Sequence, residues 1–218
     1  MRARDHLVIS AALLVFTMPS FAQAESSAPR AGSDDSDEDR WSFDFTTTGY
    51  VVPHDRSYAS PTFRADRQHL HTEARYNYEN QKTGSLWLGY NFSTGQNVAL
   101  DITPMLGGVF GNTTGIAPGF SFAVTYKKLE LFSEGEYVFD TGNQSSNFFY
   151  SWIELTYSPV DWFHTGLVSQ RTRAYQTELD VQRGISLGIS HKNADFTMYV
   201  FNAGWTDPTF VFSLGFTF

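Results

Sequence analysis

The carboxy-terminal segment, residues 210–218, alternates between large apolar side chains and small ones. One face of an extended strand would hold Phe210, Phe212, Leu214, Phe216 and Phe218, and the other would hold only valine, serine, glycine and threonine. Successive side chains of a strand point to opposite faces, so this period of two predicts a β-strand. Large apolar groups on one face and small ones on the other suit a strand between lipid and a lumen. The segment therefore predicts one strand of a transmembrane β-barrel.

The same alternation recurs along the chain between clusters of turn residues. The clearest segments are 70–78, 86–92, 98–106, 120–126, 129–139, 149–157, 163–171, 181–191, 196–202 and 210–218. Segments 41–52 and 60–65 raise the number to twelve, an even number that leaves both chain ends on one side of the membrane. Pro61 makes segment 60–65 the weakest assignment. We predict an all-β fold, a transmembrane antiparallel up-and-down β-barrel of twelve strands, with ten as the alternative.

The connections between these segments alternate in length. With the carboxy-terminus in the periplasm, the short turns at 127–128 and 192–193 are periplasmic, and the longer loops at 53–59, 140–146 and 172–179 lie outside. Outer-membrane barrels have short periplasmic turns and longer outer loops. The lengths therefore support both the strand count and the orientation.

The two faces of the predicted strands differ in chemistry. Nearly all outward positions are apolar, and aromatic residues gather near the strand ends, Tyr78 among them, as two girdles at the membrane interfaces would require. The inward positions hold most of the charges. The predicted lumen-lining residues are Glu73, Arg75, Asp101, Glu134, Glu136 and Glu154. A charge facing the lipid midplane costs roughly 2–4 kcal/mol, so this sorting supports the barrel. Arg183 is the one outward exception.

The amino-terminal part has a different composition. Residues 1–24 combine a charged start, an apolar run and an Ala-Gln-Ala end, which predicts a secretory signal peptide. Residues 25–40 are acidic, with nothing to bury, and predict a disordered periplasmic tail. The barrel then occupies residues 41–218. The protein is expected to be integral to the outer membrane.

Composition removes several functional classes. The formal net charge is −8, which argues against nucleic acid as a partner. The chain has no cysteine, so disulfides and thiolate metal sites are unavailable.

The alternation and the final Phe218 resemble the terminal strand of Gram-negative outer-membrane β-barrel proteins. That resemblance implies contact with outer-membrane lipid and lipopolysaccharide, and recognition of the last strand by the barrel-assembly machinery. Residues 84–92, 103–110 and 134–139 also resemble a family of outer-membrane barrels of unassigned function, which supplies no activity. Gly107 and Gly108 in the second of these stretches predict a bulge or bend.

An acidic lumen with few bases predicts a narrow passive channel for cations or small neutral solutes. The alternative is a closed lumen, in which Arg75 pairs with Glu73, Glu134 or Glu154 while Trp87 and Trp152 fill space. Such a non-conducting barrel would act as a structural element or bind a partner through its outer loops.

We find no complete catalytic constellation, so no enzyme and no catalytic residue are expected, and no cofactor is implied. A hydrolase at the rim or on the lipid face is a third hypothesis. His164, at the periplasmic end, is expected to be structural or interfacial. Glu134 and Glu136 could together hold a hard cation, but alternating polar residues arise in any lumen, and we expect no metal site.

Overall fold

A computed structural model describes residues 40–51, 57–142, 147–171, 181–204 and 208–218. The expected signal peptide and acidic tail, apart from Arg40, lie outside the described residues, as do parts of the loops at 53–59 and 140–146 and the whole of the loop at 172–179. In the described part of the chain all regular structure is β. The strands are β1 (Ser42–Val51), β2 (Tyr58–Arg67), β3 (Leu70–Tyr76), β4 (Thr83–Tyr90), β5 (Phe92–Thr94), β6 (Ala99–Gly111), β7 (Gly115–Tyr126), β8 (Leu129–Asp140), β9 (Phe148–Val160), β10 (Phe163–Arg171), β11 (Gln182–His191), β12 (Ala194–Phe201) and β13 (Thr209–Thr217).

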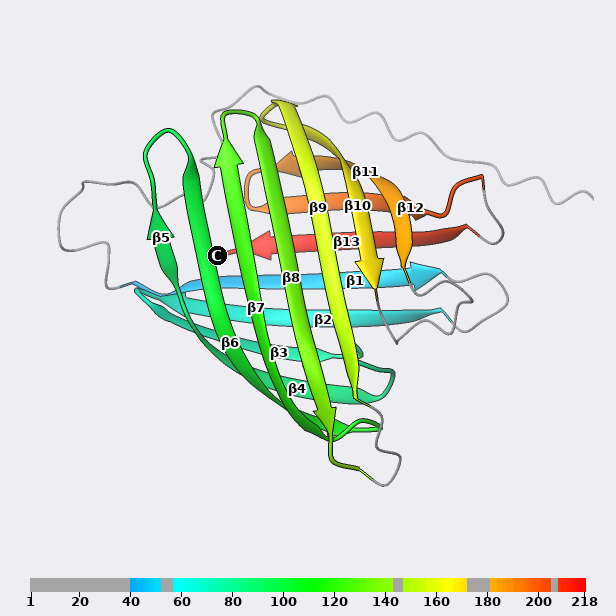
Figure 1. The fold of residues 1–218 in the computed structure, drawn as a ribbon. Coiled ribbons are helices and arrows are strands. Elements are labelled where there is room, and N and C mark those ends of the chain that lie inside the picture. The colour runs from blue at the N-terminus through cyan, green and yellow to red at the C-terminus, as the bar shows by residue number, and fades with distance from the viewer. Residues whose placement is uncertain (1–39, 52–56, 143–146, 172–180, 205–207) are drawn as a thin grey trace, which may run out of the picture.

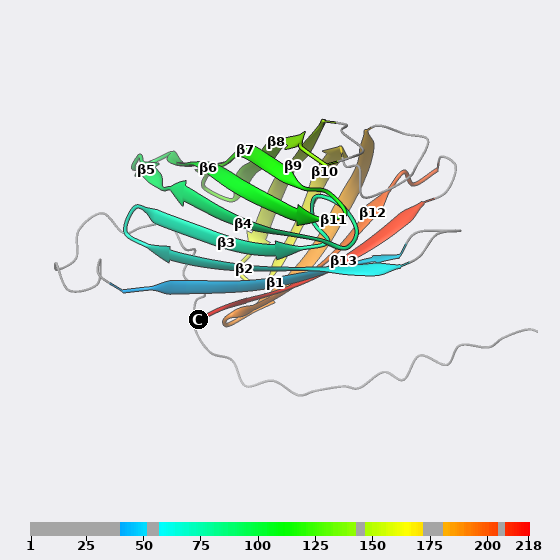
Figure 2. The ribbon, with the colours of Figure 1, turned by 90° about the horizontal axis from the view of Figure 1, so that it is seen from below.

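The strands form one closed antiparallel sheet (Figures 1 and 2). Each strand pairs with its neighbours in the sequence, and the ring closes where β1 pairs with β13, with Asp44 opposite Thr217 and Val51 opposite Phe210. The short β5 and the longer β4 both pair with β6, so they are two parts of one strand, interrupted at Asn91. The described residues therefore form a twelve-stranded barrel, which confirms the predicted number.

The strand that contains Pro61 is present as β2. Pro61 lies opposite Thr47 of β1, and β2 pairs with β1 from Tyr58 to Asp66 and with β3 from Thr62 to Arg67. Proline cannot donate a ladder hydrogen bond, but one missing donor does not interrupt the register on either side. The strand is also longer than the six residues that the sequence indicated.

The two ends of the barrel differ. At one end, two-residue turns join consecutive strands, and Gln68, Lys127 and Lys192 in these turns have φ values of 51°, 55° and 54°. Positive φ is what tight hairpin turns between twisted strands require. The start of β1 and the end of β13 lie at this same end, the short-turn end. The opposite end carries connections that are longer on average, although residues 112–114 form a short one there and residues 95–98 a four-residue one at the short-turn end. We refer to this opposite end as the long-loop end.

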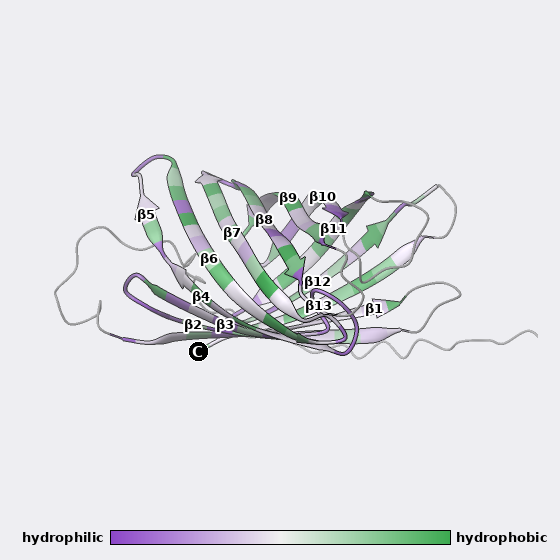
Figure 3. Ribbon diagram, turned by 60° about the horizontal axis from the view of Figure 1, so that its bottom comes forward, coloured by the Kyte–Doolittle hydropathy of each residue, from purple (hydrophilic) through white to green (hydrophobic). Residues whose placement is uncertain are grey.

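The outside of the barrel is apolar. Exposed apolar side chains recur at every second position of most strands. Figure 3 shows the corresponding alternation of hydrophobic and hydrophilic bands along the ribbon. Leu86 is 60% exposed and Leu167 is 63% exposed. Exposing this much apolar surface to water costs free energy, whereas exposing it to hydrocarbon does not. The other outward residues include Leu88, Leu106, Phe110, Ile116, Ile153, Leu155, Ile185, Leu187, Ile189, Phe210, Phe212, Leu214, Phe216 and Phe218. This is the wall of a transmembrane barrel.

Within the described residues, no helix has the length and apolar character needed to cross a membrane.

Arg183 is exposed on the outer wall as the second residue of β11, close to the long-loop end, where its charge can reach the interface.

Two local predictions were wrong. Tyr78 was expected on the lipid face, but Asn77 has a φ of 57°, which breaks the alternation after β3 and directs Tyr78 into the barrel. The expected bulge at Gly107 and Gly108 is absent, because β6 pairs there with β4 and β7 without a shift of register. The glycine at 107 is instead required by a side chain inside the barrel, described below.

If the outer wall faces lipid, a charge on the outward face of a strand should cost far more unfolding free energy than the same charge on the inward face. Leu167→Arg places a charge on the lipid face near the middle of β10, so the free energy of unfolding should fall by about 2–4 kcal/mol. Urea-induced unfolding from lipid vesicles, followed by tryptophan fluorescence, measures it. As a control, Thr156→Arg places the same side chain inside the barrel and should cost less than about 1 kcal/mol. Equal costs for the two variants would contradict a lipid-facing wall.

Candidate functional site in the barrel lumen

A single guanidinium group organises the middle of the lumen. Arg75, on β3, has a side chain with no exposed surface. Its Nε lies 2.5 Å from Glu73 Oε2, its Nη2 lies 2.7 Å from Glu134 Oε1, and its Nη1 donates to Glu136 Oε2 at 3.0 Å. Glu134 and Glu136 belong to β8, which β4, β6 and β7 separate from β3 around the ring. The pairing therefore joins, across the lumen, two strands that are not neighbours.

Two aromatic rings enclose the same guanidinium. Its Cζ lies 4.5 Å from the ring centroid of Tyr78 and 4.6 Å from that of Trp87. A delocalised cation between ring faces gains cation–π attraction when water is excluded. The Trp87 ring packs flat against Gly107, where a Cβ atom would lie 2.6 Å from the ring. Gly107 therefore makes room for the tryptophan that covers Arg75.

The charged network continues toward the short-turn end. Arg64 Nε donates to Glu73 Oε1 at 3.0 Å. His71 lies between two carboxylates, with Nδ1 2.6 Å from Asp66 Oδ1 and Nε2 2.8 Å from Glu73 Oε1. Because a carboxylate oxygen accepts but does not donate, both ring nitrogens must carry a proton, and the ring is an imidazolium ion. Cations and carboxylates thus alternate through this part of the lumen.

Toward the long-loop end, packed apolar side chains fill the barrel. One cluster contains Trp87, Met105, Val109, Ala117 and Val138, and the other contains Tyr50, Val168, Phe201 and Val211. We call the two clusters together the apolar plug. Val138, Ala117, Phe201 and Val211 have no exposed surface. Between the clusters, Tyr78 donates to the hydroxyl of Tyr150 at 2.9 Å.

A carboxyl group in the turn after β3 is also buried. Glu79 accepts hydrogen bonds from the hydroxyl of Ser85 and the indole of Trp87, and its other oxygen has no hydrogen-bond partner. Burial raises the pKa of Glu79 above its usual range, although Arg75 and the two donors act in the opposite direction. A protonated carboxyl can supply its own donor in this setting.

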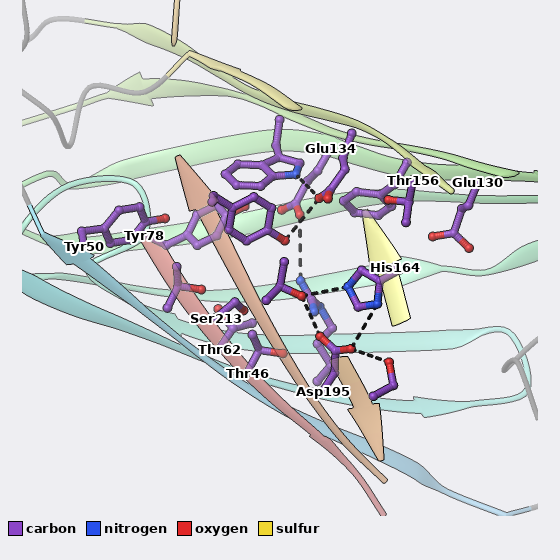
Figure 4. Close-up of a pocket in the computed structure, with 18 of the residues that line it drawn as sticks. Thr46, Tyr50, Thr62, Tyr78, Glu130, Glu134, Thr156, His164, Asp195 and Ser213 are labelled. Carbon is purple, nitrogen blue, oxygen red and sulfur yellow. Dashed lines mark hydrogen bonds and ion pairs between the residues drawn. The ribbon is translucent and has the colours of Figure 1, made fainter. Parts of the chain in front are cut away.

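A cavity of about 410 Å³ occupies the other half of the lumen. Figure 4 shows Tyr50 and Tyr78 toward one of its ends and Glu130 and Thr156 toward the other. Glu130 is exposed and is the second residue of β8, directly after the turn at Lys127 and Lys128. The cavity therefore reaches the short-turn end and stops at the apolar plug.

The walls of this cavity are acidic, aromatic and hydroxylated. The carboxylates are Glu130, Glu134, Glu154 and Asp195, and the aromatic groups are Tyr50, Tyr78, Phe132, Tyr150, Trp152 and Tyr199. Arg64 and His164 supply the basic groups, and the remaining lining residues are threonines and serines. Glu154 accepts hydrogen bonds from Ser186 at 2.8 Å and from Trp152 and Tyr199 at 3.3 Å.

His164, Asp195 and Thr197 lie together on this wall but do not form a nucleophile with its base. His164 Nε2 lies 3.0 Å from Thr197 Oγ1, while Thr197 donates its own proton to Asp195 Oδ1 at 2.8 Å. Activation would require that proton to point at the imidazole. The expected structural role for His164 fits this arrangement, and its ring packs where Gly188 leaves space.

The structure brings five of the six predicted lumen residues into these two neighbouring sites. Glu73, Arg75, Glu134 and Glu136 form the central network, and Glu154 lies on the cavity wall. Asp101, on β6, is half-buried near the short-turn end and lines neither the network nor the cavity. The strand predicted for membrane insertion, Phe210 to Phe218, presents its five large side chains outward.

Sequence patterns missed several of the residues that pack inside the lumen. Tyr78 and Glu79 follow a break in the alternation, and Tyr150 looks like any inward strand residue. Asp195 and Thr197 alternate with apolar residues in β12, which indicates that they point inward, but the alternation does not show that they line a cavity. Among the described residues, no group of three or more histidine and acidic side chains is arranged to hold a metal ion.

Comparisons with known proteins give little further information. No protein-family model matches the chain, so the resemblance to a family of unassigned function is not confirmed. No curated protein matches either. Among solved structures, the crystal structure of Pseudomonas aeruginosa OpdQ is similar over 80% of this chain and 62% of its own, with 11% sequence identity and a TM-score of 0.41. The part of this chain that matches thus spans less than two thirds of OpdQ.

The Arg75 network predicts a large cost for losing its cation. Arg75→Met leaves Glu134 and Glu136 buried without the cation next to them, while Glu73 keeps Arg64 and His71. The free energy of unfolding should therefore fall by about 3–5 kcal/mol. Urea-induced unfolding in vesicles measures the change. Replacing Glu134 and Glu136 by glutamine in the Arg75→Met background, with Glu73 kept as the partner of Arg64 and His71, should restore part of the loss. If that combined variant is less stable than Arg75→Met alone, the charges are not the cause.

The two adjacent glycines of β6 give a matched pair. A Cβ at Gly107 would lie 2.6 Å from the Trp87 ring, whereas one at Gly108 meets nothing within 4 Å. Gly107→Ala should therefore cost about 1–3 kcal/mol of unfolding free energy. Gly108→Ala should change stability by less than about 0.5 kcal/mol. Comparable losses at both positions would mean that β6 needs glycine for its backbone and not for Trp87.

Proposed function

We propose that this chain is an outer-membrane β-barrel whose lumen is closed in its outer half and open to the periplasm as a solute-sized chamber. The observation that supports the closure is the Arg75 network together with the apolar plug. A guanidinium group without exposed surface bridges β3 and β8, and the clusters beyond it include side chains without exposed surface. A water-filled path past these groups would hydrate them.

The orientation follows from the two ends of the barrel. Short turns face the periplasm in outer-membrane barrels, so the short-turn end and the cavity mouth are periplasmic in this proposal. The amino-terminal tail, which precedes β1, is then periplasmic as well. The outer wall would contact lipid and lipopolysaccharide, and the strand that ends at Phe218 would be the element that the barrel-assembly machinery recognises.

A narrow passive channel is the second candidate, and one observation favours it. The cavity reaches from the short-turn end to the apolar plug and carries Glu130, Glu134, Glu154 and Asp195 against Arg64 and His164. If side chains of the plug move aside, this excess of carboxylates would favour cations or small neutral solutes over anions. The two candidates differ in whether the resting barrel conducts.

Planar-bilayer recording of the refolded protein separates them. The wild-type barrel should show no stable conductance steps, whereas Tyr78→Ala with Tyr150→Ala removes the hydrogen-bonded pair between the apolar clusters and should open a cation-preferring path. The matched control, Tyr76→Ala with Tyr137→Ala, removes two exposed outward tyrosines and should stay silent.

Stable cation-selective conductance in the wild-type protein would replace the closed barrel by the narrow channel. Anion preference in the opened variant would contradict the acidic lumen in both candidates. A silent inner variant would show that the tyrosine pair is not the barrier.

A further inference from the structure

The cavity combines carboxylates and ring faces at one place, which closure of the lumen does not require. We propose that it is a binding site for a small organic ammonium ion that enters from the short-turn end. This inference rests on the proposed function, because that function opens the cavity to the periplasm. The volume of about 410 Å³ lies within the range of small-molecule sites.

The charge of the cavity selects a cation. Four carboxylates line it, and Arg64, which also lines it, is already paired with Glu73 at 3.0 Å and lies 3.9 Å from Glu134. Glu134 Oε1 lies 2.7 Å from Arg75 Nη2 but accepts no aligned hydrogen bond. Even with His164 counted as a second lining base, the four carboxylates outnumber the two basic groups, so the cavity would repel an anion.

Glu154 is the carboxylate that best fits an ammonium group. It is 9% exposed, and its three hydrogen bonds come from the neutral donors Ser186, Trp152 and Tyr199. Among the described residues, no lysine or arginine forms an ion pair with it. A buried carboxylate held only by neutral donors gains further from a cation, because charge-assisted contacts are the stronger ones.

Three aromatic residues lie beside the same carboxylate, two of them as its hydrogen-bond donors. Trp152 and Tyr199 meet edge to face with their centroids 5.1 Å apart, and Phe132 lies opposite Glu154 in the register of β8 and β9. Ring faces attract ammonium groups, tryptophan most strongly, and the attraction grows when water is excluded. An inorganic cation would use the carboxylates but not the rings. The combination therefore favours an organic cation.

The rest of the lining suits a ligand with a polar second end. Thr46, Thr48 and Thr62 line the wall formed by β1 and β2, and Thr156 and Ser158 lie nearer the mouth. Hydroxyl groups can both donate and accept, so they bind a hydroxylated tail without selecting its charge. The site should accordingly favour an ammonium compound that also carries a hydroxyl group.

Calorimetric titration of the full-length barrel in detergent micelles tests the inference, with choline as the probe. The uncharged carbon isostere of choline, dimethylbutanol, has the same shape without the charge. Choline should bind saturably and more tightly than the isostere by at least about tenfold. Glu154→Gln should weaken choline binding by about tenfold or more. Asp101→Asn, which removes a lumen carboxylate outside the cavity, should leave it unchanged.

Folding of each variant is checked by its heat-dependent migration on gels. If Glu154→Gln does not fold, Trp152→Leu and Trp152→Phe provide the same test, since the first removes the ring face and the second keeps one. Equal binding of choline and its isostere, or choline binding unaffected by Glu154→Gln or by Trp152→Leu, would overturn the inference. Absence of saturable choline binding would overturn it too. None of these results bears on closure of the lumen, which conductance measures.

Discussion

A charge placed inside this barrel must find its partner inside the barrel. The wall outside is hydrocarbon-facing, so neither bulk water nor an external counter-ion can reach a group such as Arg75 from the side. The structure meets this constraint by setting Glu73, Glu134 and Glu136 around one guanidinium and two aromatic rings over it. The position of β3 against β8, and the filling of the lumen between them, depend on this pairing.

Much of the fold could be predicted because the membrane imposes a strict rule on every second residue. The apolar wall and the inward position of residues such as Glu134 follow from the alternation. The number twelve follows from the alternation together with the need for an even number of strands. Side chains that break the alternation could not be predicted in the same way. Tyr78 turns inward because Asn77 takes a positive φ, and nothing in the spacing indicates that choice.

The contacts inside the lumen could not be predicted without the register between strands. The packing of Trp87 on Gly107 depends on β4 and β6 being paired at those two residues. The approach of Phe132 to Glu154 depends in the same way on β8 and β9. A single sequence gives the face of each residue but not its height in the barrel. The division of the lumen into a filled half and an open chamber therefore became visible only in the structure.

The closing pair of strands has a consequence for how the chain matures. The backbone of Phe218 exchanges hydrogen bonds with that of Phe43, at 2.9 and 3.1 Å, so the last residue is joined to the first strand. β13 must be synthesised before the seam can form, and until then both seam edges expose unpaired amide groups. The nascent polypeptide must consequently be kept from aggregating in transit, and deleting even a few terminal residues would shorten the seam itself.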